Sequence, residues 1–341
     1  MKLMGIDWGK SRIGISVSNS SWSIVSPVST LKNKSDIIEK ITELKNQYNI
    51  KRFVIGLPLS ISEGNIKKHW GGFLFFEKLK RNVKCPISWS DERFSTEESF
   101  EKLSEIELKH SFKRKKVDQV SAVIILERYI TQKKKNKNVV LAVTGNIGTG
   151  KSFVNKKFKN LFDAVLIDAD NIAKRISQIG KNGYKKIKTE FGETYFKKNG
   201  KLNRKKLGER VFKNDEMRKK LNNLLHPIII DNIKEKISNF KNKFIVLEIP
   251  LLIEEKLYYL YDYSLLTKAS KDVIIERVKK TRDHFDSNYI QKIMNKQAKS
   301  KEIENLFDYI INTANGWDSY KKNVKRIGKK ILKYQEKLNR R

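Results

Sequence analysis

The sequence is poor in the residues that hold structural metals. Cys85 is the only cysteine among 341 residues, so no intramolecular disulfide can form. The four histidines, at positions 69, 110, 226 and 284, lie far apart along the chain. No Cys/His spacing is therefore typical of a zinc site.

Long hydrophobic runs are also missing. No run of 18 apolar residues occurs, so we expect neither a membrane-spanning helix nor a membrane partner. Asp7 interrupts the short apolar N-terminus, which is not typical of a signal peptide. We therefore expect a soluble cytoplasmic protein.

Arginine and acidic residues are scarce relative to lysine. Lys+Arg number 73 and Asp+Glu 38, giving a net charge of +35, but only 15 of the basic residues are arginine. A basic chain suggests a nucleic-acid or other anionic partner. Lysine is less suited than arginine to bidentate recognition of phosphate or guanine. An AT-rich coding sequence, which enriches lysine, accounts for the overall charge equally well.

The length predicts two domains, because single domains typically have about 100–200 residues. The chain is 39% hydrophobic, which is enough for two cores. Residues 131–138 are polar and basic, and we interpret them as a short tether. The expected domains are residues 1–135 and 138–341.

Both domains are expected to be α/β. In the first, apolar stretches predict strands and helical spacing predicts helices, which gives a mixed sheet; the strands are 3–7, 13–17, 24–28, 53–55 and 87–90, and the helices 36–48, 67–81, 96–103 and 117–130. In the second, long helical segments separate apolar strands, which predicts a parallel doubly wound sheet; the strands are 139–143, 164–167, 244–247, 263–267 and 309–311.

A glycine-rich turn follows the first strand of the second domain and fits the phosphate-loop pattern G-x-x-x-x-G-K-[ST]. Its residues are Gly145, Asn146, Ile147, Gly148, Thr149, Gly150, Lys151 and Ser152. The strand before it and the helix after it are the context that supports the motif. Such a loop cradles ATP phosphates; Lys151 would bridge the β- and γ-phosphates, and the Ser152 hydroxyl would bind Mg²⁺.

Two carboxylates, Asp168 and Asp170, follow the next strand. At the carboxyl end of a parallel strand they would face the ligand crevice. One could accept the proton of an attacking hydroxyl, and either could bind a metal-bound water. The alternative is that Asp170 caps the following helix.

The second domain resembles dephospho-coenzyme A kinase in AVTGNIGTGKSFV (142–154), LIDADNIAKR (166–175), LHPI (225–228), EIPLLIE (248–254) and DYIIN (308–312). The resemblance implies a P-loop NTPase-type kinase domain with helical acceptor and lid regions, with ATP, Mg²⁺ and dephospho-CoA as ligands. Asp170 would be the general base and Asp168 would assist or organise the metal. Position 146 is Asn where the family usually has Gly.

The same resemblance assigns further roles. The acceptor pocket would be shaped by Arg204, His226 and the segment from Pro250 through Leu251 to Leu252. Arg282 would come from the lid, and Asn312 would lie near the adenine. The alternatives are a solvated helix face for Arg204 and, at His226-Pro227, a helix break with a buried, satisfied histidine.

Three acidic positions of the first domain stand beside apolar segments. Asp7 ends a strand, Asp91 and Glu92 follow another, and Asp118 lies at the start of a predicted helix. If they converge, clustered carboxylates can hold two Mg²⁺ ions for phosphodiester hydrolysis. Alone, Asp118 could be a first-turn helix acid.

The first domain resembles a ribonuclease H-like family of Holliday-junction resolvases or pre-16S rRNA processing nucleases. The matching segments are GIDWGKSRIGISVSN (5–19), VIGLPLS (54–60), DERFST (91–96) and KKVDQVSAVIILERYI (115–130). The resemblance implies that Asp7, Asp118 and either Asp91 or Glu92 bind metal, and that Arg12 and Arg93 contact a nucleic-acid backbone. The basic run 113–116, expected on a loop before Asp118, suits phosphate contacts.

The sequence thus predicts a kinase fused to a nuclease acting on pre-16S rRNA or branched nucleic acid. Two alternatives remain open. Residues 1–135 could be a non-catalytic RNA-binding or scaffold module, or the phosphate-loop half could act on another small acceptor. Neighbouring genes joined in a compact genome would account for the fusion.

Overall fold

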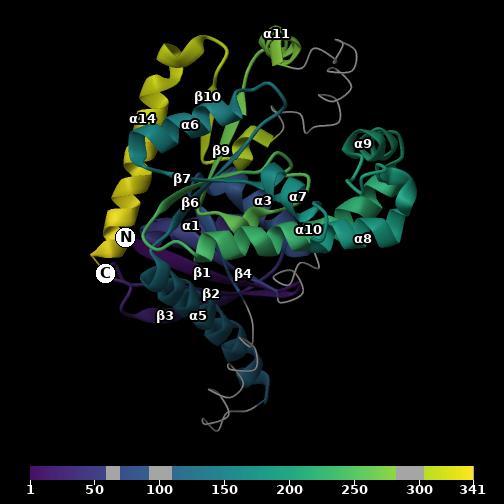
Figure 1. Ribbon diagram of the computed structural model, residues 1–341. Helices are drawn as coiled ribbons and strands as arrows, with labels where there is room; N and C mark the ends of the chain where they lie inside the picture. The colour runs from purple at the N-terminus through teal and green to yellow at the C-terminus, as the bar shows by residue number, and fades with distance from the viewer. Residues whose placement is uncertain (59–69, 92–109, 282–302, 341) are drawn as a thin grey trace.

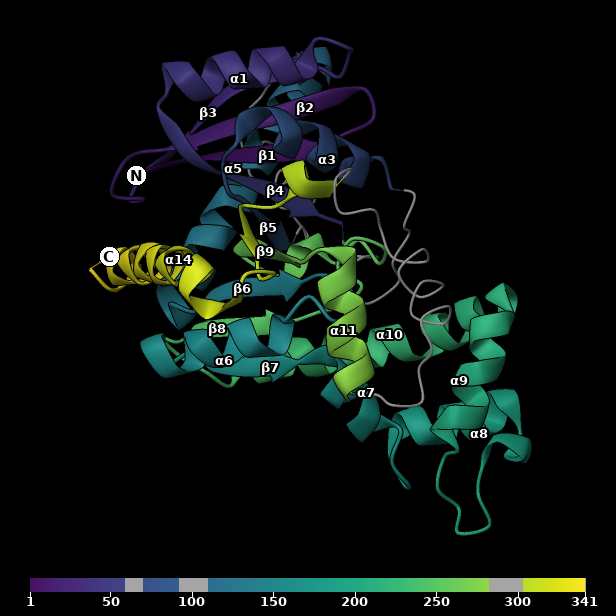
Figure 2. The same ribbon diagram turned by 90° about the horizontal axis from the view of Figure 1, so that it is seen from above.

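The computed structural model describes residues 1–58, 70–91, 110–281 and 303–340 (Figure 1). Within these ranges the strands form two five-stranded sheets, ordered β3-β2-β1-β4-β5 and β10-β9-β6-β8-β7. Figure 2 shows the two sheets following one another across the molecule, with β5 on the side of the first sheet that faces the second. No helix of the described residues is both long and apolar enough to cross a membrane.

The N-terminal sheet is mixed, as the sequence predicts. Strands β1, β2 and β3 pair antiparallel, whereas β1, β4 and β5 pair parallel. In chain order the elements are β1 (Lys2–Trp8), β2 (Arg12–Ser18), β3 (Val25–Lys32), α1 (Ile37–Gln47), β4 (Ile50–Leu57), α3 (Gly71–Val83), β5 (Ile87–Asp91) and α5 (His110–Asn136). The helix expected at 96–103 lies outside the described residues.

The C-terminal sheet is parallel throughout, again as predicted. Its strands are β6 (Val139–Thr144), β7 (Val165–Asp168), β8 (Phe244–Glu248), β9 (Tyr263–Lys268) and β10 (Tyr309–Asn312). The α-helices are α6 (Lys151–Phe162), α7 (Ala169–Ile176), α8 (Asn182–Phe191), α9 (Arg204–Lys213), α10 (Asp215–Ser238), α11 (Lys271–Thr281) and α14 (Gly316–Asn339); short 3-10 helices are η1 (Glu193–Tyr195), η2 (Tyr258–Leu260) and η3 (Glu304–Leu306).

Helix α5 is longer than the sequence predicts at both ends. It begins at His110, so the basic run 113–116 lies on a helix and not on a loop, and Asp118 is not a first-turn acid. It ends at Asn136, so most of the expected tether is helical. Lysine and arginine are good helix formers, and the apolar periodicity used to place the helix does not detect segments rich in them.

Helix α10 also differs from one expectation. It continues through Pro227, so the helix break considered at His226-Pro227 is wrong. Proline removes one backbone donor from a helix interior, which a long helix with a packed face can tolerate. Ile230 and Ile233 of α10 are buried.

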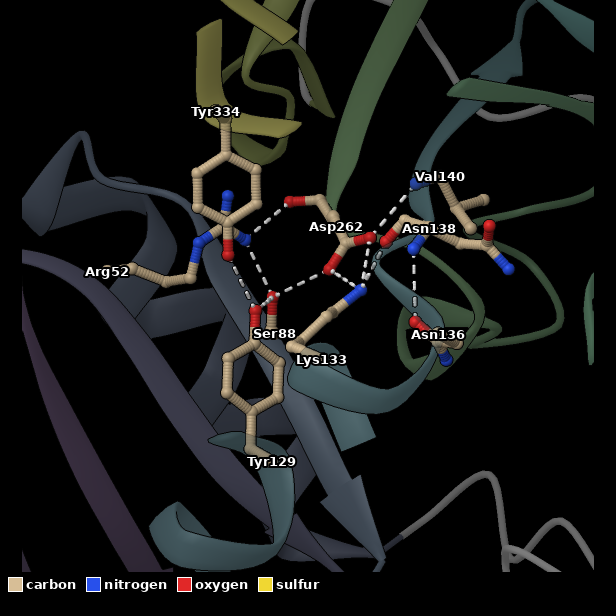
Figure 3. Close-up of polar contacts among 9 residues, drawn as sticks. All are labelled: Arg52, Ser88, Tyr129, Lys133, Asn136, Asn138, Val140, Asp262 and Tyr334. Carbon is tan, nitrogen blue, oxygen red and sulfur yellow. Dashed lines mark hydrogen bonds and ion pairs between the residues drawn. The ribbon is translucent and has the colours of Figure 1, made fainter. Parts of the chain in front are cut away.

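The two sheets share a buried polar interface centred on Arg52 of β4, which is 1% exposed (Figure 3). Its Nη1 donates to Ser88 Oγ at 2.6 Å and to the carbonyl of Asp262 at 2.9 Å. The guanidinium lies 4.6 Å from the ring centroid of Tyr263 and 4.5 Å from that of Tyr334. Two aromatic faces thus stabilise a cation that is out of contact with water.

Asp262 receives bonds from both halves of the chain. Lys133 of α5 lies 2.7 Å from its carboxylate, and the N–H of Val140 on β6 donates to it at 2.9 Å (Figure 3). The carboxylate and the charges of Arg52 and Lys133 therefore compensate one another at the boundary. A cavity of about 690 Å³ adjoins this cluster and is lined by α5, β5 and α10.

We expect Arg52→Leu to lower the free energy of unfolding by about 3–5 kcal/mol, because it removes one member of a buried charge cluster. Lys51→Leu, at an exposed position of the same strand, is the matched control. Urea denaturation measures both. Equal stability of the two variants would contradict a central role for Arg52.

Candidate functional sites

The phosphate loop connects β6 to α6 with a backbone that needs glycine at three positions. Gly145, Gly148 and Gly150 have φ of 148°, 74° and 79°, values that disfavour other residues. A Cβ on Gly145 would also overlap the carbonyl of Thr267. Asn146 has no positive φ, so asparagine is compatible with this position.

The loop is held by hydroxyl groups from β9 and from the residue that follows β10. Thr149 Oγ1 lies 2.8 Å from Thr267 Oγ1 on β9, and Thr313 Oγ1 donates to the carbonyl of Thr149 at 2.9 Å. Arg277 of α11 binds Thr313 through Nη1 at 2.8 Å and Nη2 at 2.7 Å. Sequence reasoning did not single out Arg277; a lone arginine on a helix carries no motif.

Lys151 and Ser152 stand where the loop enters α6. Lys151 Nζ donates to the carbonyls of Gly145 at 2.8 Å and Asn146 at 3.0 Å, so its ammonium lies over the loop. Ser152 Oγ is 3.5 Å from Glu248 Oε1 at the end of β8. The hydroxyl and the carboxylate both offer oxygen ligands of the kind that Mg²⁺ prefers.

Three carboxylates gather at the adjacent strand ends. Asp168 and Glu248 are register partners on β7 and β8, and Asp170 follows in the first turn of α7. Burial raises the pKa of Glu248, Lys151 opposes the shift, and Asp168 and Asp170 add to it. The sequence did not distinguish Glu248 from a structural acid, although it ends an apolar strand as Asp168 does.

Asp168, rather than Asp170, caps helix α7. Its carboxylate accepts from the backbone N–H of Asn171 at 3.1 Å and from Asn171 Nδ2 at 2.8 Å. Asp170 is exposed in the first helical turn. The capping alternative considered for Asp170 is therefore wrong.

The expected acceptor residues lie on three elements. Arg204 begins α9, is exposed and donates to the carbonyl of Lys174 at 2.6 Å. His226 of α10 lies 3.0 Å from the buried Glu255 carboxylate, so its ring is held by a partner. Pro250 and Leu251 follow β8, and Leu251 is 38% exposed.

Of the two residues expected on the ATP side, the structure places Asn312 but does not describe Arg282. Asn312 ends β10, where its Oδ1 accepts from the N–H of Ala314 at 3.0 Å. Arg282 lies outside the described residues.

In the N-terminal part, Asp7 and Asp118 are brought together. Asp7 on β1 pairs with Gly14 on β2, and a Cβ on Gly14 would overlap the carbonyl of Asp118. Glycine therefore lets α5 lie directly against the sheet, with Asp118 beside Asp7. Arg12 Nε is 2.8 Å from Asp118 Oδ2.

Burial raises the pKa of Asp7 to about 7, and the charge of Asp118 adds to the shift. Burial also raises the pKa of Asp118, although Arg12 opposes it. Such a pair suits a bound cation, which would compensate both charges.

The third expected acid is not placed. Asp91 ends β5 opposite Leu57, but its side chain and residues Glu92 and Arg93 lie outside the described set. Among the described residues no group of three or more His, Cys, Asp or Glu side chains forms a metal site.

Comparison with known proteins assigns the two halves. The family model described as dephospho-CoA kinase matches residues 139–319, just over half of the chain. The chain belongs to the dephospho-CoA kinase family. A second model, described as Holliday junction resolvase, matches residues 1–132, so the chain is a fusion of a resolvase-like part and a kinase.

Similar proteins agree with this assignment. The dephospho-CoA kinase of Mannheimia succiniciproducens is 33% identical over 198 residues, 58% of this chain and 90% of its own. The dephospho-CoA kinase of Bacillus cereus is 35% identical over 177 residues, which are 51% of this chain and 88% of that protein. The crystal structure of TT1252 from Thermus thermophilus covers 56% of this chain and 96% of its own at 24% identity, with a TM-score of 0.50, which supports the fold.

The raised pKa of Asp7 predicts a pH dependence of stability. Between its usual value near 3.8 and about 7, the folded state holds a proton that the unfolded state releases, so stability falls as pH rises through this window. We expect Asp7→Asn to remove the fall and to raise the melting temperature above pH 7 by a few degrees in EDTA, with no difference near pH 4. Thermal melting across pH measures this; equal melting temperatures above pH 7 would contradict it.

Proposed function

We propose that residues 138–341 transfer the γ-phosphoryl group of ATP to the ribose 3′-hydroxyl of dephospho-CoA. The observation that carries the proposal is the placement of Asp168, Asp170 and Glu248 beside the phosphate loop, in a chain of this family. Phosphoryl transfer requires positioning and charge neutralisation more than covalent catalysis.

Each group of the loop has a role in this proposal. The backbone N–H groups at the start of α6 and Lys151 would bind the phosphates. Ser152 and Asp168 would hold Mg²⁺, which would supply positive charge against the phosphates. Asn312 would lie near the adenine, and Arg282 would neutralise charge from the lid.

The acceptor side completes the reaction. Asp170 takes the proton of the 3′-hydroxyl, whose oxygen bonds to the γ-phosphorus as the bond to the bridging oxygen breaks and ADP leaves. Arg204, His226, Pro250 and Leu251 would bind dephospho-CoA. Glu248 would orient Ser152 through their contact.

We expect Lys151→Ala to lower kcat for coenzyme A formation by about 100- to 1,000-fold, because it removes a cation from the transferring group. The assay couples ADP release to a colour change, with coenzyme A identified by mass spectrometry. Lys156→Ala, on the exposed face of α6, is the matched control. If the wild type binds ATP and yields no coenzyme A, the acceptor is wrong, and a panel of alcohols and nucleotides would identify another.

For residues 1–135 we propose a Mg²⁺-dependent nuclease acting on pre-16S rRNA or branched nucleic acid. The observation that favours it is the pair of half-buried acids, Asp7 and Asp118, set together by Gly14. Asp7, Asp118 and Asp91 or Glu92 would bind the metal, which would supply an activated water. Arg12 and Arg93 would contact the phosphate backbone.

We expect Asp118→Asn to abolish Mg²⁺-dependent cleavage, since the variant loses a carboxylate that would bind the metal. Nucleic-acid binding should persist, because no basic side chain is removed. A gel assay with a pre-16S rRNA fragment and a four-way junction measures cleavage and binding together. Asp36→Asn, at an acid paired with Lys40 on the surface, is the control. Binding without cleavage by the wild type would favour the scaffold alternative.

A further inference from the structure

The segment after β8 forms a tight turn, here named the acceptor loop (residues 249–258). The N–H groups of Glu255, Lys256 and Leu257 each donate at 3.1 Å to carbonyls within the loop. Lys256 has φ of 52°, in the left-handed region. Leu252 is fully buried, whereas Leu251 stays 38% exposed. The loop is therefore anchored on one side and open on the other.

One anchor lies on the kinase's own helix α10. Glu255, 5% exposed, accepts from Asn222 Nδ2 at 3.3 Å and lies 3.0 Å from His226 Nδ1. This contact links the loop to the helix that carries another acceptor residue.

The second anchor comes from the nuclease-like part. Glu77 of α3 forms an ion pair with Lys256 and accepts a hydrogen bond from the Tyr258 hydroxyl at 2.7 Å. The Glu77 and Lys256 side chains are 15% and 22% exposed, so water screens the pair only in part. Burial and the Glu77 carboxylate raise the pKa of Tyr258, so its hydroxyl remains a donor.

Packing reinforces this anchor. The ring of Phe76, next to Glu77, stacks on Tyr258 with centroids 4.4 Å apart and planes 28° apart. Phe73, one turn earlier on α3, meets the same ring edge-on at 5.8 Å. Tyr258 is fully buried. Helix α3 therefore contributes both charge and shape to the loop's position.

We propose that Glu77, although it lies in the nuclease-like part, is a positioning residue for the kinase: it holds the acceptor loop in the conformation that binds dephospho-CoA. The inference rests on the proposed function, which gives the loop its substrate. Glu77 acts through Lys256 and Tyr258 and leaves the phosphate loop, which α11, β9 and Thr313 hold, unaffected. The nuclease-like part thereby helps to position the acceptor loop of the kinase.

The test compares the effect of Glu77 variants on KM for dephospho-CoA with their effect on KM for ATP. Glu77→Lys removes the carboxylate that accepts from Tyr258 and sets two lysines against each other, so we expect it to raise KM for dephospho-CoA by about tenfold or more. We expect KM for ATP to stay within about twofold, since tertiary contacts to the phosphate loop persist. Glu77→Gln, which keeps an acceptor for Tyr258, should have a smaller effect. Lys78→Gln, at the exposed neighbouring position, is the control.

Exchanging the two charges of the ion pair should rescue the Glu77→Lys variant. Combining Glu77→Lys with Lys256→Glu restores an ion pair of opposite polarity, and KM for dephospho-CoA should return towards the wild-type value. Hydrogen exchange of residues 249–258 should rise in Glu77→Lys and fall again in the double variant, which reports on the loop directly.

Other results would overturn the inference. Unchanged KM for dephospho-CoA, or an equal rise of both KM values with a lower melting temperature, would make Glu77 a structural residue only. A folded wild type that does not phosphorylate dephospho-CoA would instead refute the proposed function, and with it the substrate role of the loop.

Discussion

The buried guanidinium of Arg52 is the constraint around which the two halves are arranged. A cation without access to water needs compensation, which here comes from two tyrosine rings and from the hydrogen bonds that Nη1 donates to Ser88 and the backbone of Asp262. These partners come from β5, from the start of β9 and from α14. Among the described residues, Nε and Nη2 of Arg52 have no hydrogen-bond partner. The groups that surround this one side chain therefore fix how the first sheet meets the second.

The same arrangement explains why this boundary resembles a core more than a linker. Only Lys137 and Asn138 separate α5 from β6, so the halves cannot move apart without breaking the contacts that Lys133 and Arg52 make with Asp262. Functional groups meanwhile stand at strand carboxyl ends and loops, where parallel sheets leave backbone groups free. Rigidity at the boundary is thus compatible with two open sites.

Local sequence patterns predicted the sheets and the phosphate loop because strand periodicity and glycine spacing are short-range signals. They failed at 131–136, where charged residues continue a helix. They also gave no sign of the contacts that Arg52 makes with the Asp262 carbonyl and Lys80 with the Asp308 carboxylate, 210 and 228 residues away. Glu248 shows a different failure: its position at a strand end was visible, but its contact with Ser152 requires the fold.

The charges at the boundary favour specificity over stability. Lys80 with Asp308 and Lys133 with Asp262 join basic residues of the first half to acids of the second, and Glu77 with Lys256 reverses the polarity. Replacing buried ion pairs by apolar residues often costs nothing, so such pairs are weak evidence for stability. An apolar boundary would, however, tolerate sliding, whereas paired charges of mixed polarity admit one register. That register sets Glu77 against the acceptor loop.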